Sequence, residues 1–216
     1  MESINDAKLP RGPAKKGRKL GRAFYARDDT LLVARELLGK RLVVPAADGA
    51  RVSGLIVETE AYMGPEDKAS HAFGGRRTGR TEMMYARGGT VYVYLIYGLH
   101  HQFNVVTGAE GVPHAVLVRA LEPEEGAALM RARRGLEDVR RLASGPGKLC
   151  QALALDRSYN GEDLTRTRAW IEDAGRRFGP REIARGPRVG IDYAQEYAAR
   201  PWRFWVKGSP FVSRKA

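Results

Sequence analysis

Three carboxylates lie within the first ten residues of the stretch VETEAYMGPEDKASHAFGGRR, residues 57–77, and a histidine follows them. Glu58 and Glu60 alternate with Thr59, so on a strand both carboxylates share one face. Two like charges there repel, unless one meets an arginine or each has its own role. A partly buried carboxylate is a suitable general base for activating water. The pair is a candidate catalytic site, and exposed acids at a strand end are the alternative.

Tyrosines lie close to these acids in the sequence. Tyr62 follows them directly, and the next apolar run, TVYVYLIYG, contains Tyr92, Tyr94 and Tyr97. Aromatic rings can sandwich a nucleobase, because every base has a π-face. Ordinary packing of an aromatic strand in the core is the alternative. Tyr97 differs, because it precedes Gly98 at an expected hairpin turn, where an aromatic side chain could act as a wedge in DNA.

The chain is strongly basic. Lys and Arg total 37 against 25 acids, a formal net charge of +12 among 216 residues. Such an excess commonly marks a polyanionic partner, although a highly soluble protein without an anionic ligand is the alternative. Together with the carboxylates and tyrosines, the charge indicates an enzyme that acts on a base extruded from duplex DNA. These residues leave glycosylase, deaminase and methyltransferase open, but the zinc deaminases are disfavoured because their H-x-E…P-C-x-x-C set is missing.

Several other kinds of site are disfavoured by the motifs. The sequence has no phosphate-binding G-x-x-x-x-G-K-[ST], no H-E-x-x-H and no G-x-G-x-x-G after a strand. One cysteine, Cys150, cannot form an internal disulfide or a thiolate-rich metal site. His100 and His101 would face opposite ways on a strand and are better explained as polar hairpin residues. We expect no metal, no cofactor and, since no apolar run approaches ~18 residues, no membrane span.

The elements that must position these residues indicate an α+β fold. We expect one domain with a curved, mostly antiparallel, open barrel-like β-sheet, surrounding helices and a protruding hairpin. Helices are predicted at residues 28–39, 124–134 and 147–155, and strands at 41–46, 51–62, 90–98, 100–108, 114–123 and 200–213. Asp48-Gly49 would turn the first hairpin, which places Glu60 at or just beyond the end of its second strand. Residues 64–89 read as a long functional loop.

The chain divides into a tail and one domain. Pro, Gly and basic residues in KLPRGPAKKGRKL predict a flexible basic tail at residues 1–20, and residues 21–216 form a single domain. An extra apolar face is not evident, so we expect a monomer. We also expect a cytoplasmic location, associated with the nucleoid in a bacterium or nuclear in a eukaryote.

Several long strings resemble the alkyladenine (3-methyladenine) DNA glycosylase family, in consistent order from about residue 20 onward. They are VETEAYMGPEDKASHAFGGRRTGRT, GTVYVYLIYGLHHQFNVVT, VLVRALEPEEG, SGPGKLCQALAL and RPWRFWVKGSPFVS. The resemblance implies a monofunctional DNA glycosylase that uses water, without a cofactor, to remove alkylated or deaminated purines from double-stranded DNA.

The resemblance also implies roles for individual residues. Glu60 matches the general base, and Arg119 and the Val189 carbonyl match groups that hold the attacking water. The base pocket would be formed by Tyr62, His71, Tyr94 and Asn104, and the bulk of Asn104 would disfavour the 2-amino group of normal guanine.

The implied DNA contacts lie outside the base pocket. Tyr97 matches the wedge that fills the gap left by the flipped nucleotide, beside Leu99, where the family often has methionine. Arg76 and Lys148 match phosphate contacts. A damage-binding protein that flips bases without cutting is the main alternative, and an RNA-binding module is a third. The presence of both Glu60 and Arg119 favours the enzyme.

Overall fold

Strand β3 (Arg51–Met63) lies at the centre of the computed structural model, which describes residues 17–214. One edge of β3 pairs with β6 (His114–Glu125) along most of its length. The other edge pairs first with β2 (Lys40–Pro45) and then with β9 (Arg203–Val206). Neighbours on both edges satisfy the backbone of β3, so the strand can carry polar side chains deep inside the protein.

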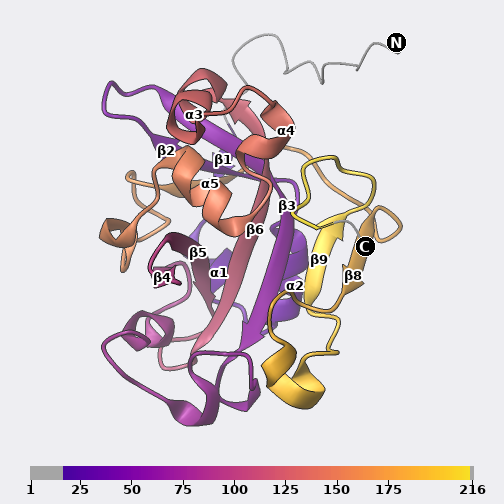
Figure 1. The fold of residues 1–216 in the computed structure, drawn as a ribbon. Helices are drawn as coiled ribbons and strands as arrows, with labels where there is room; N and C mark the ends of the chain where they lie inside the picture. The colour runs from indigo at the N-terminus through magenta and orange to yellow at the C-terminus, as the bar shows by residue number, and fades with distance from the viewer. Residues whose placement is uncertain (1–16, 215–216) are drawn as a thin grey trace.

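The described strands form one open antiparallel sheet (Figure 1). Its order is β1-β7-β2-β3-β6-β5-β4, and β8 joins through β9. The remaining strands are β1 (Arg18–Lys19), β4 (Val91–Ile96), β5 (His100–Thr107), β7 (Trp170–Asp173) and β8 (Ile183–Gly186). The path ends at β1 and β4 rather than closing on itself, which confirms the predicted α+β class with an open sheet.

Helices cover the sheet and complete the core. They are α1 (Arg22–Tyr25), α2 (Thr30–Glu36), α3 (Ala127–Arg134), α4 (Val139–Leu142) and α5 (Pro146–Leu153). Helix α2 begins at Asp29, whose side chain accepts a hydrogen bond from the Leu32 N–H at 2.8 Å. The Thr59 hydroxyl donates to the Ala34 carbonyl of α2 at 2.8 Å. Thr59 therefore faces α2, and Glu58 and Glu60 face the opposite side of β3.

Short 3-10 turns form much of the connecting chain. Within the long loop predicted at residues 64–89 they are Gly64–Glu66, Phe73–Gly75 and Glu82–Tyr85. Two more lie at Arg157–Tyr159 and Asp192–Tyr197. In Figure 1 the loop after β3 lies at the lower end of the sheet, away from α3 and α4.

Two expectations are wrong in detail. Glu60 lies inside β3, not at or beyond its end, because β6 pairs with the strand as far as Met63 and β9 pairs with residues 58–60 on the other edge. The predicted tail extends too far toward the C-terminus, since Arg18–Lys19 pair with β7 and Leu20 is buried. The rest of the tail, residues 1–16, lies outside the described residues.

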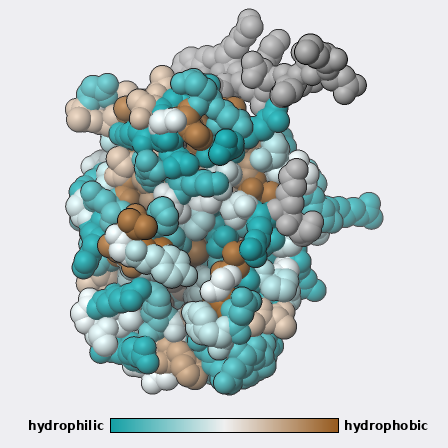
Figure 2. Space-filling model, viewed as in Figure 1, coloured by the Kyte–Doolittle hydropathy of each residue, from teal (hydrophilic) through white to brown (hydrophobic). Residues whose placement is uncertain are grey.

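The surface that faces the viewer in Figure 1 is largely hydrophilic, with apolar side chains in small, separate patches (Figure 2). Among the described residues, no helix is long and apolar enough to cross a membrane.

Gly54 lies where β3 and β6 approach most closely, at a β-bulge. A Cβ atom there would meet the Glu122 carbonyl oxygen at 2.8 Å and the Leu121 Cβ at 3.0 Å. We expect Gly54→Ala to lower the free energy of unfolding by about 1–3 kcal/mol, as overpacking does in other cores. Urea unfolding measures the change. Gly79→Ala is the control, because a Cβ there meets nothing within 4 Å; equal losses would contradict the explanation.

Candidate active site

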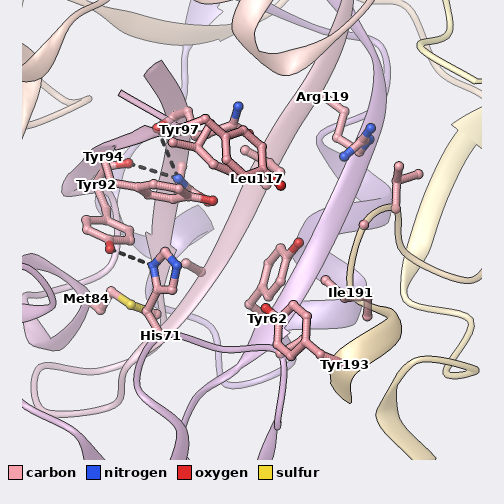
Figure 3. A pocket seen from close by; sticks show the side chains of 17 residues that line it. Tyr62, His71, Met84, Tyr92, Tyr94, Tyr97, Leu117, Arg119, Ile191 and Tyr193 are labelled. Carbon is pink, nitrogen blue, oxygen red and sulfur yellow. Dashed lines mark hydrogen bonds between the residues drawn. The ribbon is translucent and has the colours of Figure 1, made fainter. Parts of the chain in front are cut away.

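A cavity of about 160 Å³ opens on the face of the sheet that carries Glu58 and Glu60. Its lining comes from Tyr62 on β3, from β4 and the turn after it, from β5 and β6, from the loop after β3 and from the segment 189–193. Figure 3 shows His71, Tyr92 and Tyr94 on one side, Tyr62 with Ile191 and Tyr193 on the other, and Arg119 beyond Tyr62. An engineered cavity of about 150 Å³ can hold benzene, so this space suits a planar heterocycle.

Glu60 lies behind the cavity lining and is completely buried. Its Oε1 accepts from the Val189 backbone N–H at 2.7 Å, and its Oε2 accepts from the Tyr62 hydroxyl at 2.9 Å. The Arg119 Nη1 forms an ion pair with Oε2 at 3.2 Å. All three partners line the cavity. A single layer of residues thus separates the Glu60 carboxylate from anything bound in the cavity.

Glu58 also binds the Arg119 guanidinium, through a different nitrogen from the one that contacts Glu60. The Arg119 Nε donates to Glu58 Oε1 at 3.0 Å, and Ser213 donates to the same carboxylate from its backbone at 2.6 Å and its hydroxyl at 2.9 Å. Burial alone would lower the pKa of Arg119, but Glu60 and Glu58 outweigh it and raise the pKa. Arg119 therefore remains charged and relieves the repulsion expected between the two acids.

Two β-bulges bring these side chains together. The β3–β6 register pairs Ile56 with Leu121, Glu58 with Ala120 and Thr59 with Val118. Val57 and then Arg119 are therefore the extra residues, first on β3 and then on β6. A bulge turns a strand locally and re-aims a side chain, which explains how Arg119 contacts both glutamates.

His71, Tyr92 and Tyr94 form the aromatic wall. The His71 Nδ1 is hydrogen-bonded to the Tyr92 hydroxyl at 2.9 Å, and its ring meets Tyr94 edge to face at 4.6 Å. Burial, and then the positive charges of Arg80 and Arg76, lower the pKa of His71 to about 4. The imidazole is therefore neutral near pH 7 and does not repel a cation.

A buried ion pair fixes the opposite wall. Arg188 lies over the Tyr62 ring at 4.7 Å, and its Nη2 donates to Asp67 Oδ1 at 2.8 Å. Asp67 also accepts the backbone N–H of Ala69 at 3.0 Å, close to His71 in the chain. Arg188 directly precedes Val189, whose backbone N–H donates to Glu60. The Arg188–Asp67 ion pair therefore positions both the loop after β3 and this donor.

Asn104 connects the aromatic wall to the acids. The register places Tyr92, Asn104, Leu117 and Glu60 in one row across four strands. The Asn104 Nδ2 donates to the carbonyls of Tyr92 at 3.1 Å and of Gln102 at 3.2 Å. These bonds fix the orientation of the amide in the pocket.

The residues predicted to contact DNA are all exposed, and one of them, Tyr97, also lines the cavity. Tyr97 lies at the tip of the β4–β5 hairpin, has φ of 52° and is 85% exposed, and Leu99 is 76% exposed. Arg76, in the loop after β3, and Lys148, on α5, are also exposed. The hairpin thus protrudes as expected, with an aromatic side chain left outside the core.

Some site residues were not predicted from the sequence. Asp67 and Arg188 are 121 residues apart, and Ser213 lies 155 residues from Glu58, so no local pattern links them. Gln102 and the exposed Tyr193 also line the cavity. Strand alternation from Asn104 could have identified Gln102.

Comparison with known proteins agrees with this geometry. The model of the family described as "Methylpurine-DNA glycosylase" matches residues 23–210. The chain belongs to the methylpurine-DNA glycosylase family. The resemblance to this glycosylase family is therefore confirmed, and the matched residues include β2 to β9 and every predicted site residue.

Bacterial relatives of this methylpurine-DNA glycosylase family member carry the name "Putative 3-methyladenine DNA glycosylase". One from Desulfitobacterium hafniense (strain Y51) is 48% identical over 206 residues, covering 92% of this chain and 100% of the relative. One from Bacillus cytotoxicus is 48% identical over 200 residues, covering 88% and 97%. One from Bacillus cereus (strain G9842) is 48% identical over 202 residues, covering 89% and 98%.

The buried, neutral His71 makes stability depend on pH. Its pKa is 6.5 ordinarily and about 4 in the folded protein, so between these values the unfolded chain binds more protons. Stability should therefore fall as pH decreases from 6.5 to 4, by up to about 1.4 kcal/mol per pH unit for this one group. We expect His71→Asn to show a shallower loss than the wild type in urea unfolding over this range. Parallel curves would mean that His71 titrates normally.

Proposed function

We propose that the protein excises alkylated and deaminated purines from double-stranded DNA by water attack on the N-glycosidic bond. The substrates would include 3-methyladenine, 7-methylguanine, hypoxanthine and ethenoadenine. The observation that carries this proposal is the buried Glu60–Arg119 pair directly behind an aromatic cavity of the size of a heterocycle. Family membership independently supports DNA glycosylase activity on methylated purines.

In the proposed reaction, the damaged nucleotide leaves the stack and its base enters the cavity between Tyr62 and His71. The C1′–N9 bond breaks and its electron pair goes to the base. The water oxygen bonds to C1′ and its proton passes to Glu60. As the sugar gains positive charge, the Glu60 carboxylate also stabilises it electrostatically.

Water must reach Glu60 for this step. In the structure, the Tyr62 hydroxyl donates a hydrogen bond to Glu60 Oε2, and the Val189 N–H donates one to Glu60 Oε1. Rotation of the Tyr62 hydroxyl would free one carboxylate lone pair for water, and the Val189 carbonyl would be a second acceptor for it. Arg119 would keep the Glu60 carboxylate in place, because the contact between Arg119 and Glu58 does not depend on the water.

Aromatic walls and a neutral histidine suit a positively charged methylated purine. Tyrosine faces attract such a cation by about 1–2 kcal/mol when water is excluded. At the edge of the pocket, Leu99 and Tyr97, which also lines the cavity, would fill the gap left by the flipped nucleotide. The exposed Arg76 and Lys148 would contact phosphates, in agreement with the net charge of +12.

A damage-binding protein that flips bases without cutting would need the same pocket but no buried general base. An assay for abasic-site formation on a duplex with one hypoxanthine separates the two functions. Base release supports the glycosylase, and tight binding without release supports the alternative.

Glu60 and Glu58 should differ in their effect on chemistry. We expect Glu60→Gln to bind lesion DNA but to slow base release by roughly 10²–10⁴ fold, because an amide is not a general base. Glu58→Gln should cost far less per folded molecule, since its carboxylate binds Arg119 and Ser213. Single-turnover release of hypoxanthine, corrected for the folded fraction, measures both. Equal losses would contradict the assignment of Glu60.

Tyr97 should act in base flipping. Extrusion costs a few kcal/mol, and least for a poorly paired base. We expect Tyr97→Ser to slow release of a well-paired lesion several-fold more than release of the same lesion opposite a mismatch. The comparison uses two duplexes that differ only in the opposing base. Similar slowing on both would place Tyr97 in the pocket rather than in the wedge.

A further inference from the structure

Gln102 lies in the pocket wall although its side chain is polar. It is on β5, is only 7% exposed and lines the cavity. It is opposite Tyr94 in the hairpin and two residues from Asn104, so the three side chains project from one face of the ribbon. Phe103, between them, belongs to the main core. The Gln102 amide is therefore directed to the cavity side of β5.

This amide is available for a ligand. Within residues 17–214, no hydrogen bond joins the Gln102 side chain to another residue, whereas the Asn104 amide donates to two backbone carbonyls. An amide that lines a binding cavity without a partner in the protein can bond to the base that fills the cavity, since polar groups enclosed in a complex are normally hydrogen-bonded.

Three other polar side chains of the wall already have partners. The Tyr62 hydroxyl donates to Glu60, the Tyr92 hydroxyl is bonded to His71, and the Arg119 guanidinium lies between two carboxylates. A new hydrogen bond to the base would cost each of them an existing contact. Gln102 can form one without such a loss.

We propose that Gln102 donates a side-chain hydrogen bond to the flipped purine and thereby sets how well neutral damaged purines are excised relative to cationic methylated ones. The inference rests on the function proposed above. It makes Gln102 a residue that determines specificity, distinct from the water-activating pair.

The charge of the leaving base explains the difference. A neutral purine such as hypoxanthine receives the electron pair of the C1′–N9 bond and leaves with negative charge, which a donor in a water-poor pocket stabilises. A purine methylated at N3 or N7 is already cationic and leaves neutral. Its release therefore depends less on a donor and more on the tyrosine faces.

The test compares two lesions in one variant. Gln102→Met keeps the length of the side chain and removes the amide. Single-turnover release would be measured for hypoxanthine from an oligonucleotide duplex and for 3-methyladenine from methylated DNA. We expect hypoxanthine release to slow about tenfold or more relative to 3-methyladenine release, the effect of one lost transition-state hydrogen bond.

Two further variants sharpen the result. Gln102→Glu places an acceptor without a donor at this position, so hypoxanthine release should again fall selectively while 3-methyladenine release is retained. Gln151→Met, on the exposed side of α5, removes a glutamine amide elsewhere and should leave the ratio of the two rates unchanged.

Each result bears on a separate conclusion. If the wild type releases both bases and the ratio of rates is the same in Gln102→Met, the role of Gln102 is overturned and the proposed function stands. If Gln102→Glu retains hypoxanthine release, the residue does not act as a donor. A wild type that releases neither base would overturn the proposed function and this inference with it.

Discussion

One buried positive charge, that of Arg119, holds the site together. It lies between Glu58 and Glu60, both inaccessible to solvent, and forms an ion pair with each of them. Burying a charge is unfavourable unless it is paired and hydrogen-bonded. The rest of the site supplies these partners: Ser213 for Glu58, and Tyr62 and Val189 for Glu60. Breaking the cluster would affect folding and chemistry together.

The cavity itself is electrostatically selective. Two buried positive charges beside it are paired, Arg119 with two carboxylates and Arg188 with Asp67, whereas Arg76 and Arg80 are exposed. His71, the titratable base of the wall, is kept neutral by burial. What faces a bound ring is therefore mainly aromatic surface, which can hold a cation, while positive charge is exposed outside the pocket, where phosphates lie. This separation lets a basic protein bind DNA and still accommodate a positively charged base.

The sequence predicted the regular parts of this structure well. Alternation in VETEAY placed Glu58 and Glu60 on one face of β3, and the β-branched and aromatic runs identified β4, β5 and β6. The helices and strands that were not predicted, β1, β7, β8, α1 and α4, have two to four residues each, too few for a periodic pattern. The bulges that re-aim Arg119 and the Asp67–Arg188 pair depend on contacts between distant segments. Glu60 was misplaced at the end of its strand because β6 and β9, both far along the chain, pair with β3 on its two edges.

The pairing of β3 with β9, a strand far along the chain, has a consequence for synthesis of the protein. Glu58 and Glu60 are made early, but β9 pairs beside them only after residue 203, and Ser213 caps Glu58 later still. A nascent chain therefore carries two acids on an unfinished strand for most of translation, with its β9 edge unpaired and open to other chains. Folding of the site must wait until about residue 213 has emerged from the ribosome, so a chain truncated before that point would have the signature residues without the centre they form.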